Sequence, residues 1–430
     1  MEGLVAMRIL LLTKYFPPEI GTAAHLFFEL AESLLQRGHQ VTVITGFPWY
    51  NVDNPDEKYR GKIFLRETLN GIQVIRIAMP RPPKGLLRYK TGHVMEPPVL
   101  FVGGLLSGEQ DIVVAYSPPL LVGFAAYLLG KLKRIPSVVN VQDLHPQCLI
   151  DLGQLKNLHL IRLLEAIESF IYRKTTCITV HSEGNRRHVL SKGGTPDRVL
   201  VIPNWVDTKL IRPSDRLNGF RRENDLNDKF VVSFAGTMGI AQGLESVLES
   251  AALLRNYEDI FFVLVGDGVK REALVAKAQQ MRLPNVKFLP MQPREKYPEI
   301  LNGSDVCLVT LGKDVSTPVV PSKLLSIMAA GRPVIASVPL NGDTHKIIKA
   351  ARCGYCIEPE NPEQLSQAIL DLYRNPSLAQ EFGKNGRCYA EEHFSREAVI
   401  GKYELLFMRL TSRNDRDGAF IDFPISFKNL

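Results

Sequence analysis

The chain is poor in cysteine, and this scarcity excludes several classes of protein. Six cysteines among 430 residues are too few for a disulfide framework. Cys353 and Cys356 form one closely spaced pair, but no second pair or histidine partner accompanies them, as a zinc site requires. We therefore predict two ordinary thiols in a strand region, which fits a reducing compartment.

Dense runs of lysine and arginine with interleaved aromatic residues are also missing, which disfavours a nucleic-acid partner. The net charge of +7 and the isoelectric point near 9.0 still fit small acidic ligands or an anionic membrane surface. A chain of this length is predicted to form two or three domains rather than one core.

No hydrophobic run is long and unbroken enough to predict a membrane span. The most apolar stretch, residues 112–130, has no charged residue, but Pro118 and Pro119 divide it into a buried strand and an apolar helix. The apolar run near the N-terminus is short and lacks a basic leader, so it is not a signal peptide. These features predict a cytoplasmic protein.

Short apolar strands alternate with helices along most of the chain. Strands are predicted at "RILLL", "QVTVIT", "IQVIRI", "IVVAY", "SVVNVQD", "CITVHS" and "VLVIPN", with helices notably at 23–37 and 158–173. After a polar stretch at 212–225 the alternation restarts at "FVVSFAG", "FFVLVGDG", "VKFLP", "VCLVT" and "PVIAS". This predicts two doubly wound α/β domains that face a cleft, residues 1–208 and 209–394, and a C-terminal segment, 395–430.

Glycine-bearing turns stand at strand ends that should face this cleft. Gly21 lies between the first strand and a helix, where the backbone can approach a ligand and helix N–H groups can bind a phosphate. "FAGTMGIAQGLE" and "LVGDG" repeat the arrangement in the second domain with Gly236 and Gly266. A tight turn explains each of these glycines equally well. Position 271 is Arg, so "LVGDG" lacks the third glycine of a dinucleotide fingerprint and a dehydrogenase is disfavoured.

The stretch "VPSKLLSIMAAGRPVIAS" places a lysine where a helix disfavours it. Ser322 is the predicted N-cap, so Lys323 stands in the first turn, where the helix dipole disfavours a cation by roughly 0.3–1 kcal/mol. A bound anion, held by the lysine and by free backbone N–H groups, would resolve the conflict. A solvated lysine is the alternative.

Taken together, these motifs resemble those of family 4 glycosyltransferases of the GT-B fold. The likeness is to the bacterial branch that builds surface polysaccharides, including fucosamine and colanic-acid type transferases, and it spans about residues 7–410. It rests on "YFPPEIGTAAHLFFELAESLLQRGHQVTVITGFP", "SPPLLVGFAAYLLGKLKRIPSVVNVQDLHP", "VHSEGNRRHVLSKG", "VIPNWVD" and the three motifs quoted above. It implies retaining transfer of a sugar from a nucleotide diphosphate donor, a UDP-sugar in this branch, without a metal or other cofactor. It also implies a lipid-linked or glycan acceptor, and a C-terminal helix that crosses back to the first domain.

The resemblance also assigns roles to individual residues. A departing diphosphate needs cations and N–H donors, and Lys323 is the leading candidate. The resemblance implies a catalytic centre at Lys323, Gly21, Gln142 and Asp143. It implies donor contacts from Gly236, Thr237, Gln242, Gly266, Met291, Thr317, Pro318, Ser322, Lys323 and Ser326.

Several positions depart from the pattern of the family. Many relatives carry two glutamates separated by seven residues, and here these positions are Pro318 and Ser326. The arginine and lysine that many relatives carry in the first glycine turn are Thr237 and Gln242, and the usual first-domain histidine falls at Gln142. These departures make Lys323 more important, with Ser326 still a candidate for contact with the ribose.

Two further segments are candidates for the acceptor side. "RPPKGLLRYKTGH" mixes leucines with cations and contains no acid, which fits a membrane-surface patch at the inner leaflet or, equally, a solvated loop before a core helix. Its lysines and arginines are Arg81, Lys84, Arg88 and Lys90. Trp49 and Tyr50, in a long polar loop, fit stacking on an acceptor sugar or packing beneath the loop.

Two other functions remain open on the sequence. A sugar-nucleotide epimerase of the same architecture should show a paired acid and base in the cleft, but Asp143 has no evident partner. A non-catalytic GT-B subunit is the second alternative, because the two glutamates are missing. The sequence specifies neither the donor sugar nor the acceptor nor the linkage.

Overall fold

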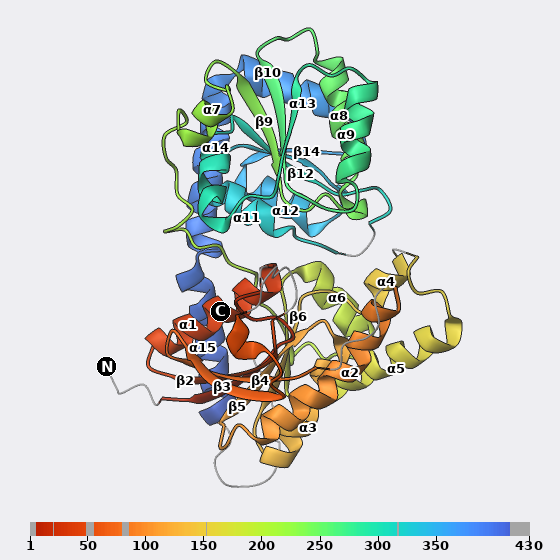
Figure 1. Ribbon diagram of the computed structural model, residues 1–430, viewed down its shortest axis with the longest axis vertical. Coiled ribbons are helices and arrows are strands. Elements are labelled where there is room, and N and C mark those ends of the chain that lie inside the picture. Colours follow the sequence, from red (N-terminus) through yellow and green to blue (C-terminus); the bar gives the residue numbers. More distant parts are fainter. Residues whose placement is uncertain are drawn as a thin grey trace. The chain divides into compact units, whose positions relative to one another are not determined.

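The computed structural model describes residues 6–19, 21–48, 56–79, 86–151, 153–315 and 318–412 (Figure 1). Some residues singled out by the sequence analysis lie outside these ranges, namely Trp49, Tyr50, Arg81, Lys84 and Thr317. The chain divides into two compact units. The first comprises Met1–Asn204 and Val399–Leu430, and the second comprises Trp205–Ala398.

The first unit is built on an eight-stranded sheet with the order β3-β4-β2-β1-β5-β6-β7-β8. Every neighbouring pair is parallel except β3 and β4, which are antiparallel. The strands are β1 (Arg8–Leu12), β2 (Gln40–Gly46), β3 (Phe64–Leu69), β4 (Ile72–Ile77), β5 (Ile112–Ser117), β6 (Ser137–Val141), β7 (Cys177–Val180) and β8 (Val199–Val201). The strand order reverses between β1 and β5, the position at which doubly wound sheets open a crevice at their carboxyl edge.

Helices cover both faces of this sheet, and the alternation of side chains along the strands shows which helix covers which face. Val139 of β6 packs in a cluster with α3 and α5, whereas the next residue, Asn140, faces the other side and donates to Tyr403 of α15 at 2.7 Å. The helices are α1 (Thr22–Gln36), α2 (Leu86–Leu105), α3 (Leu120–Lys133), α4 (Gln147–Asp151), α5 (Leu158–Lys174), α6 (Glu183–Ser191) and α15 (Arg396–Ser412). A 3₁₀ turn spans Glu57–Tyr59.

The most apolar stretch of the sequence forms the predicted strand and helix. Residues 112–117 are the fully buried central strand β5, and α3 follows from Leu120. Among the described residues, no helix combines the length and apolar character that crossing a membrane requires.

The second unit is built on a six-stranded parallel sheet with the order β11-β10-β9-β12-β13-β14. Its strands are β9 (Phe230–Ala235), β10 (Ile260–Val265), β11 (Val286–Leu289), β12 (Val306–Thr310), β13 (Val334–Ser337) and β14 (Gly354–Ile357). Here the order reverses between β9 and β12. The two doubly wound sheets that the sequence predicts are therefore confirmed.

Helices again cover both faces of the second sheet. Val232 and Phe234 of β9 pack with α8, α9 and α13, and the alternate residues Val231 and Ala235 pack with α7 and α10. The helices are α7 (Gly219–Glu223), α8 (Glu245–Leu253), α9 (Arg271–Gln280), α10 (Tyr297–Asn302), α11 (Ser322–Ala329), α12 (Asp343–Ala351), α13 (Pro362–Arg374) and α14 (Pro376–His393). Two 3₁₀ turns span Ile240–Gln242 and Arg294–Lys296.

A buried acid fixes the C-terminal helix to the first unit, where Figure 1 shows α15 beside α1. Glu404 accepts hydrogen bonds from Arg37 Nη1 at 2.6 Å and from His39 Nε2 at 3.0 Å. His39 Nδ1 accepts from the Met7 backbone N–H at 3.2 Å, so its proton is on Nε2 and points at Glu404. The predicted return of the C-terminal helix to the first domain is confirmed by these contacts.

We predict that Glu404→Gln lowers stability by about 1–3 kcal/mol, because it removes a charged acceptor from the buried His39 and from Arg37. Urea unfolding of the whole chain, followed by circular dichroism, measures the effect. Leu405→Gln is the matched control, since Leu405 is the next residue of α15 and is 47% exposed. Equal unfolding midpoints for the two variants would contradict the prediction.

Candidate functional site

Three turns meet at the carboxyl edge of the second sheet, where its strand order reverses. Gly236 follows β9, Gly266 follows β10, and α11 follows β12 in the chain. The pairing of β9 with β12 is confined to two residue pairs, Val306 with Val232 and Cys307 with Ser233. Both pairs lie in the first half of β12, so the carboxyl ends of the two strands are not joined by the ladder, which is where a ligand crevice is expected.

The two glycine turns pack backbone against backbone. A Cβ on Gly266 would lie 1.9 Å from the carbonyl oxygen of Gly236, and a Cβ on Gly268 would lie 2.5 Å from that of Met238. The Met238 N–H donates to the Asp267 carbonyl oxygen at 2.8 Å. Gly266 and Gly268 have φ of +150° and +149°, which other residues rarely adopt. These two glycines are therefore required by contact between the turns.

Lys323 places its ammonium group against this pair of turns. Its Nζ lies 3.8 Å from the centroid of the Phe234 ring, and a Cβ on Gly236 would lie 3.2 Å from Nζ. The absence of a side chain at Gly236 therefore leaves room for the ammonium group. No carboxylate of the described residues pairs with Lys323, and burial lowers its pKa to about 7. Within the described part of the chain, the cation is compensated only by a cation–π contact.

The N-terminus of α11 is open, and the predicted N-cap is wrong. The N-cap is Pro321, with extended φ and ψ of −61° and 129°, and its side chain has no oxygen with which to cap the helix. Ser322 is instead the first helical residue and is exposed. The first N–H groups of α11 thus point out of the helix without a side-chain cap, and Lys323 stands beside them.

The remaining donor-side candidates lie around this cluster. The Gln242 side-chain oxygen accepts a hydrogen bond from the Gly239 N–H of the same loop at 2.9 Å. Thr237 is exposed. Ser326 shares a hydrogen bond with the Tyr297 hydroxyl one turn into α11. Met291 is 52% exposed on the loop after β11. Pro318, half-buried, precedes α11 by a short segment.

The first-unit candidates have different surroundings. The Gln142 side chain exchanges two hydrogen bonds with Asn204, at 2.9 and 2.8 Å, and donates to Asn140 at 2.8 Å, so both of its N–H donors are used. Asp143, the next residue, is exposed. Gly21 is the N-cap of α1 with φ 165°, an extended conformation that does not require glycine.

Sequence reasoning missed three charged or titratable groups at the carboxyl edge of the first sheet. Lys14 follows β1, is 6% exposed, and lies with its Nζ 2.9 Å from Glu96 Oε2 of α2. Burial raises the pKa of Glu96, and Lys14 opposes the rise. His145 follows β6, and burial lowers its pKa to about 4, so its ring is neutral at pH 7. In the sequence, Lys14 interrupts an apolar run. This interruption is the one sequence feature that could have indicated a buried ion pair.

Metal-ligating side chains are not grouped in the described ranges, where no three His, Cys, Asp or Glu side chains are placed to hold an ion.

Two Rossmann-like units are the architecture of the GT-B fold. The family models agree. Residues 21–205 match the glycosyl transferase 4-like domain, and residues 217–388 match glycosyl transferases group 1. The chain belongs to this family of glycosyltransferases.

Relatives of known name extend the comparison. The chain is 27% identical over 410 residues to the putative colanic acid biosynthesis glycosyl transferase WcaI of Escherichia coli, covering 92% of this chain and 98% of WcaI. It is 23% identical to the O-antigen chain mannosyltransferase C of Escherichia coli, covering 94% and 99%.

Solved structures share the fold. The sucrose-phosphate synthase of Thermosynechococcus elongatus has a TM-score of 0.74 at 18% identity, covering 94% of this chain and 99% of that one. HepE of Anabaena, solved in complex with UDP, has a TM-score of 0.72 at 16% identity, covering 94% and 100%.

The unpaired ammonium group of Lys323 predicts a pH dependence of stability. Its pKa is about 7 in the folded chain and 10.5 in its ordinary state. Between these values the unfolded chain binds more protons, so unfolding free energy rises with pH, by up to about 1.4 kcal/mol per pH unit from this one group. Lys323→Met keeps an unbranched side chain that is one atom shorter, and it removes the titration.

We therefore expect Lys323→Met to be more stable than the wild type at pH 6, with the difference shrinking steadily by pH 9. Urea unfolding of both proteins across this range measures the difference. Lys349→Met, on the exposed face of α12, is the matched control and should show no such trend. Parallel stability curves for the wild type and Lys323→Met would exclude the depressed pKa.

Proposed function

We propose that this protein is a retaining, metal-independent glycosyltransferase that moves a sugar from a UDP-sugar to a lipid-linked or growing glycan acceptor in surface polysaccharide synthesis. The observation that carries the proposal is the unpaired Lys323 ammonium group beside the open N-terminus of α11, at the strand reversal of the second sheet. Such a position attracts an anion, and the donor supplies a diphosphate.

The chemistry follows from charge that develops on the leaving group. As the glycosidic bond to the diphosphate breaks, negative charge grows on the phosphate oxygens. The Lys323 ammonium group and the first N–H groups of α11 stabilise that charge, and neither needs to move first. Binding of the diphosphate raises the pKa of Lys323 again, because an opposite charge favours the protonated form. Gly236 lets the phosphates approach the ammonium group closely, with Thr237 and Gly266 at the rim.

The remaining donor contacts are assigned from position. Met291, exposed on the loop after β11, offers an apolar surface for the base, and Ser326 offers its hydroxyl to the ribose. HepE was solved with UDP and with UDP-glucose, which supports a uridine diphosphate donor. The names of WcaI and of the O-antigen mannosyltransferase support a role in surface polysaccharide synthesis.

We predict that Lys323→Ala lowers the rate of sugar transfer at least a hundredfold without unfolding the chain, because it removes one preorganised charge from the leaving group. The assay is nucleotide release from a panel of UDP- and GDP-sugars, with and without a lipid-linked acceptor extract. Lys349→Ala, an exposed lysine on α12, is the matched control and should retain full activity. Wild-type turnover by Lys323→Ala would remove Lys323 from the mechanism.

The same assay separates the alternatives. A transferase releases nucleotide in proportion to the acceptor, and the anomeric configuration of the product tests retention. An epimerase converts the donor sugar with no acceptor present, and a non-catalytic subunit binds the donor without turning it over. Tighter calorimetric binding of GDP than of UDP would overturn the choice of base.

We also propose that the first unit attaches reversibly to the inner leaflet, where a lipid-linked acceptor would lie. The described residues that support this are on the N-terminal half of α5. Leu158, Leu160 and Leu163 are 67%, 41% and 57% exposed, Arg162 is exposed among them, and Lys156 is exposed just before the helix begins. Apolar side chains flanked by cations fit an interface of acyl chains and anionic headgroups.

A second basic segment, Arg81, Lys84, Arg88 and Lys90, contributes to the same proposal. Arg88 and Lys90 belong to α2, which begins at Leu86, so the solvated loop, one of the two interpretations of this segment, does not hold for them, and their side chains lie outside the described part. Trp49 and Tyr50 remain candidates for contact with the acceptor. Each cation near an anionic surface adds about 1 kcal/mol of attraction.

Flotation with anionic vesicles tests the attachment. We expect the wild type to float at low salt and to be released at 1 M salt, where the screening length is about 3 Å. Arg88→Glu combined with Lys90→Glu should reduce flotation, as should Leu158→Gln combined with Leu163→Gln. Leu253→Gln, which is 53% exposed on α8 of the second unit, should float as the wild type does. A wild type that stays soluble at low salt would reject the proposal.

A further inference from the structure

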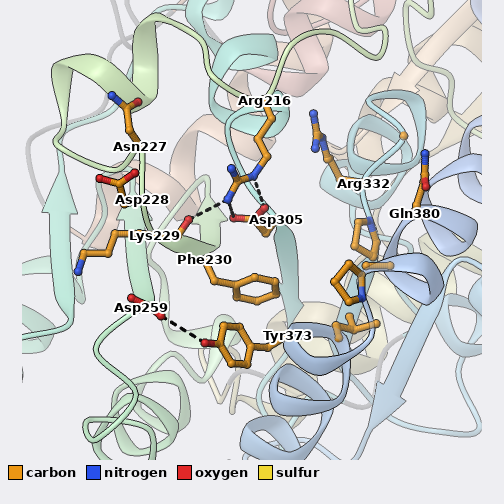
Figure 2. Close-up of a pocket in the computed structure, with 15 residues that line it drawn as sticks. Arg216, Asn227, Asp228, Lys229, Phe230, Asp259, Asp305, Arg332, Tyr373 and Gln380 are labelled. Atoms are coloured by element: carbon orange, nitrogen blue, oxygen red, sulfur yellow. Dashed lines mark hydrogen bonds and ion pairs between the residues drawn. The ribbon is translucent and has the colours of Figure 1, made fainter.

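A pocket of about 570 Å³ lies at the amino edge of the second sheet, opposite the edge that carries Lys323 (Figure 2). Its walls come from residues at the starts of four strands. Phe230 begins β9, Asp259 precedes β10, Asp305 precedes β12 and Pro333 precedes β13. Because parallel strands have distinct ends, this pocket is separate from the crevice that we assign to the donor.

Two arginines and one acid, Arg216, Arg332 and Asp305, line this pocket, and a third arginine, the fully buried Arg221, pairs with the acid. Asp305 accepts from Arg216 Nε at 2.5 Å and also from Arg221, whose remaining N–H groups bond to backbone carbonyls of Gly303 and Leu226. Its Oδ2 also accepts from the Val231 N–H at 2.7 Å. A single carboxylate therefore serves two guanidinium groups, and its acceptor capacity is fully used.

The third arginine, Arg332, has no acid of its own among the described residues. Its Nε is buried and has no hydrogen-bond partner there, and one Nη donates to the Ser214 carbonyl oxygen at 3.2 Å. The orphaned Nε is an unmet donor on a group that stays charged in proteins. The three arginines face two acids, Asp305 and the exposed Asp215, so one positive charge of this cluster is left uncompensated.

Two aromatic rings, nearly perpendicular to each other, form the apolar part of the pocket. Phe230 and Tyr373 stack edge to face with ring centroids 5.3 Å apart, and the Tyr373 hydroxyl donates to Asp259 at 3.3 Å. Figure 2 shows Asp228, Lys229 and Asp259 at one end of the pocket, and Arg332 with Gln380 at the other. Asp228 and Asp259 are thus at the end of the pocket away from Arg332.

We propose that this pocket binds a small organic anion, a monophosphate ester with a flat ring. Its phosphate is held by Arg332 and Arg216, and its ring lies on Phe230 and Tyr373. A guanidinium group with a free donor suits phosphate oxygens, and two aromatic side chains suit a ring. The ligand is distinct from the sugar donor in place, so binding here does not depend on the function proposed above.

Calorimetry with phenyl phosphate and with inorganic phosphate tests the site on the full chain. We expect phenyl phosphate to bind more tightly than inorganic phosphate, because only the ester reaches the two aromatic rings. Arg332→Gln should weaken phenyl phosphate at least tenfold. Gln380→Glu should weaken phenyl phosphate binding severalfold, because it adds a negative charge at the mouth of the pocket. This substitution removes no contact. The new acid also stands in the first turns of α14, where the helix dipole favours a negative charge.

The Lys323→Ala variant separates the two edges of the sheet. It should leave phenyl phosphate affinity within twofold of the wild type, while Arg332→Gln should leave UDP affinity unchanged. Absence of saturable phenyl phosphate binding to the wild type at millimolar concentration would overturn the proposal. The proposal would also be overturned if Lys323→Ala abolished phenyl phosphate binding while Gln380→Glu left it intact. In that case the anion would occupy the carboxyl edge of the sheet. Should Arg332→Gln fail to fold, as judged by circular dichroism, the Gln380→Glu result decides.

Discussion

The half-buried ammonium group of Lys323 is the constraint on which the rest of the site depends. A cation removed from water and left without a carboxylate destabilises the fold, and its pKa of about 7 expresses that cost. The surrounding structure accommodates the ammonium group but does not neutralise it with an acid. Phe234 offers a ring face, Gly236 offers empty space, and Pro321 leaves the end of the helix open. The ring face compensates the cation only in part, and together these features make a preformed place for an anion.

The two units treat a lysine at the strand reversal in opposite ways. Lys14 follows β1 in the first sheet and is paired with Glu96 at 2.9 Å, so its charge is neutralised inside the unit. Lys323 follows β12 in the second sheet and is paired with nothing that the described residues contain. Because a buried pair has little net charge to offer a ligand, Lys14 is expected to order its surroundings. Lys323, in contrast, is available for a diphosphate, which is why the donor is assigned to the second unit.

The sequence predicted the architecture well because buried parallel strands are continuous apolar runs. It missed β3, whose "FLRETL" mixes charged and apolar residues, because this antiparallel edge strand is half exposed along its whole length. The sequence placed Gly236, Gly266 and Lys323 at strand ends, but it did not show that Gly266 is needed for contact with Gly236 itself. It also placed the N-cap at Ser322, whereas Pro321 occupies that position and leaves the helix end without a side-chain cap. Contacts between distant residues were out of reach, among them Gln142 with Asn204 and Arg221 with Asp305, because no local pattern encodes them.

The pairing of β9 with β12 connects the two edges of the second sheet. The ladder holds only at Val232–Val306 and Ser233–Cys307, and just before it Asp305 ties the amino end together by accepting from Val231. Arg216 and Arg221 hold that carboxylate in place by ion pairs, so the amino ends of β9 and β12 are held together. The carboxyl ends of the two strands are not paired. Lys323 lies where the ladder has ended, over the Phe234 ring of β9. The acid that binds both arginines at the amino edge therefore also holds β9 and β12 in the register that leaves room for an ammonium group at the carboxyl edge.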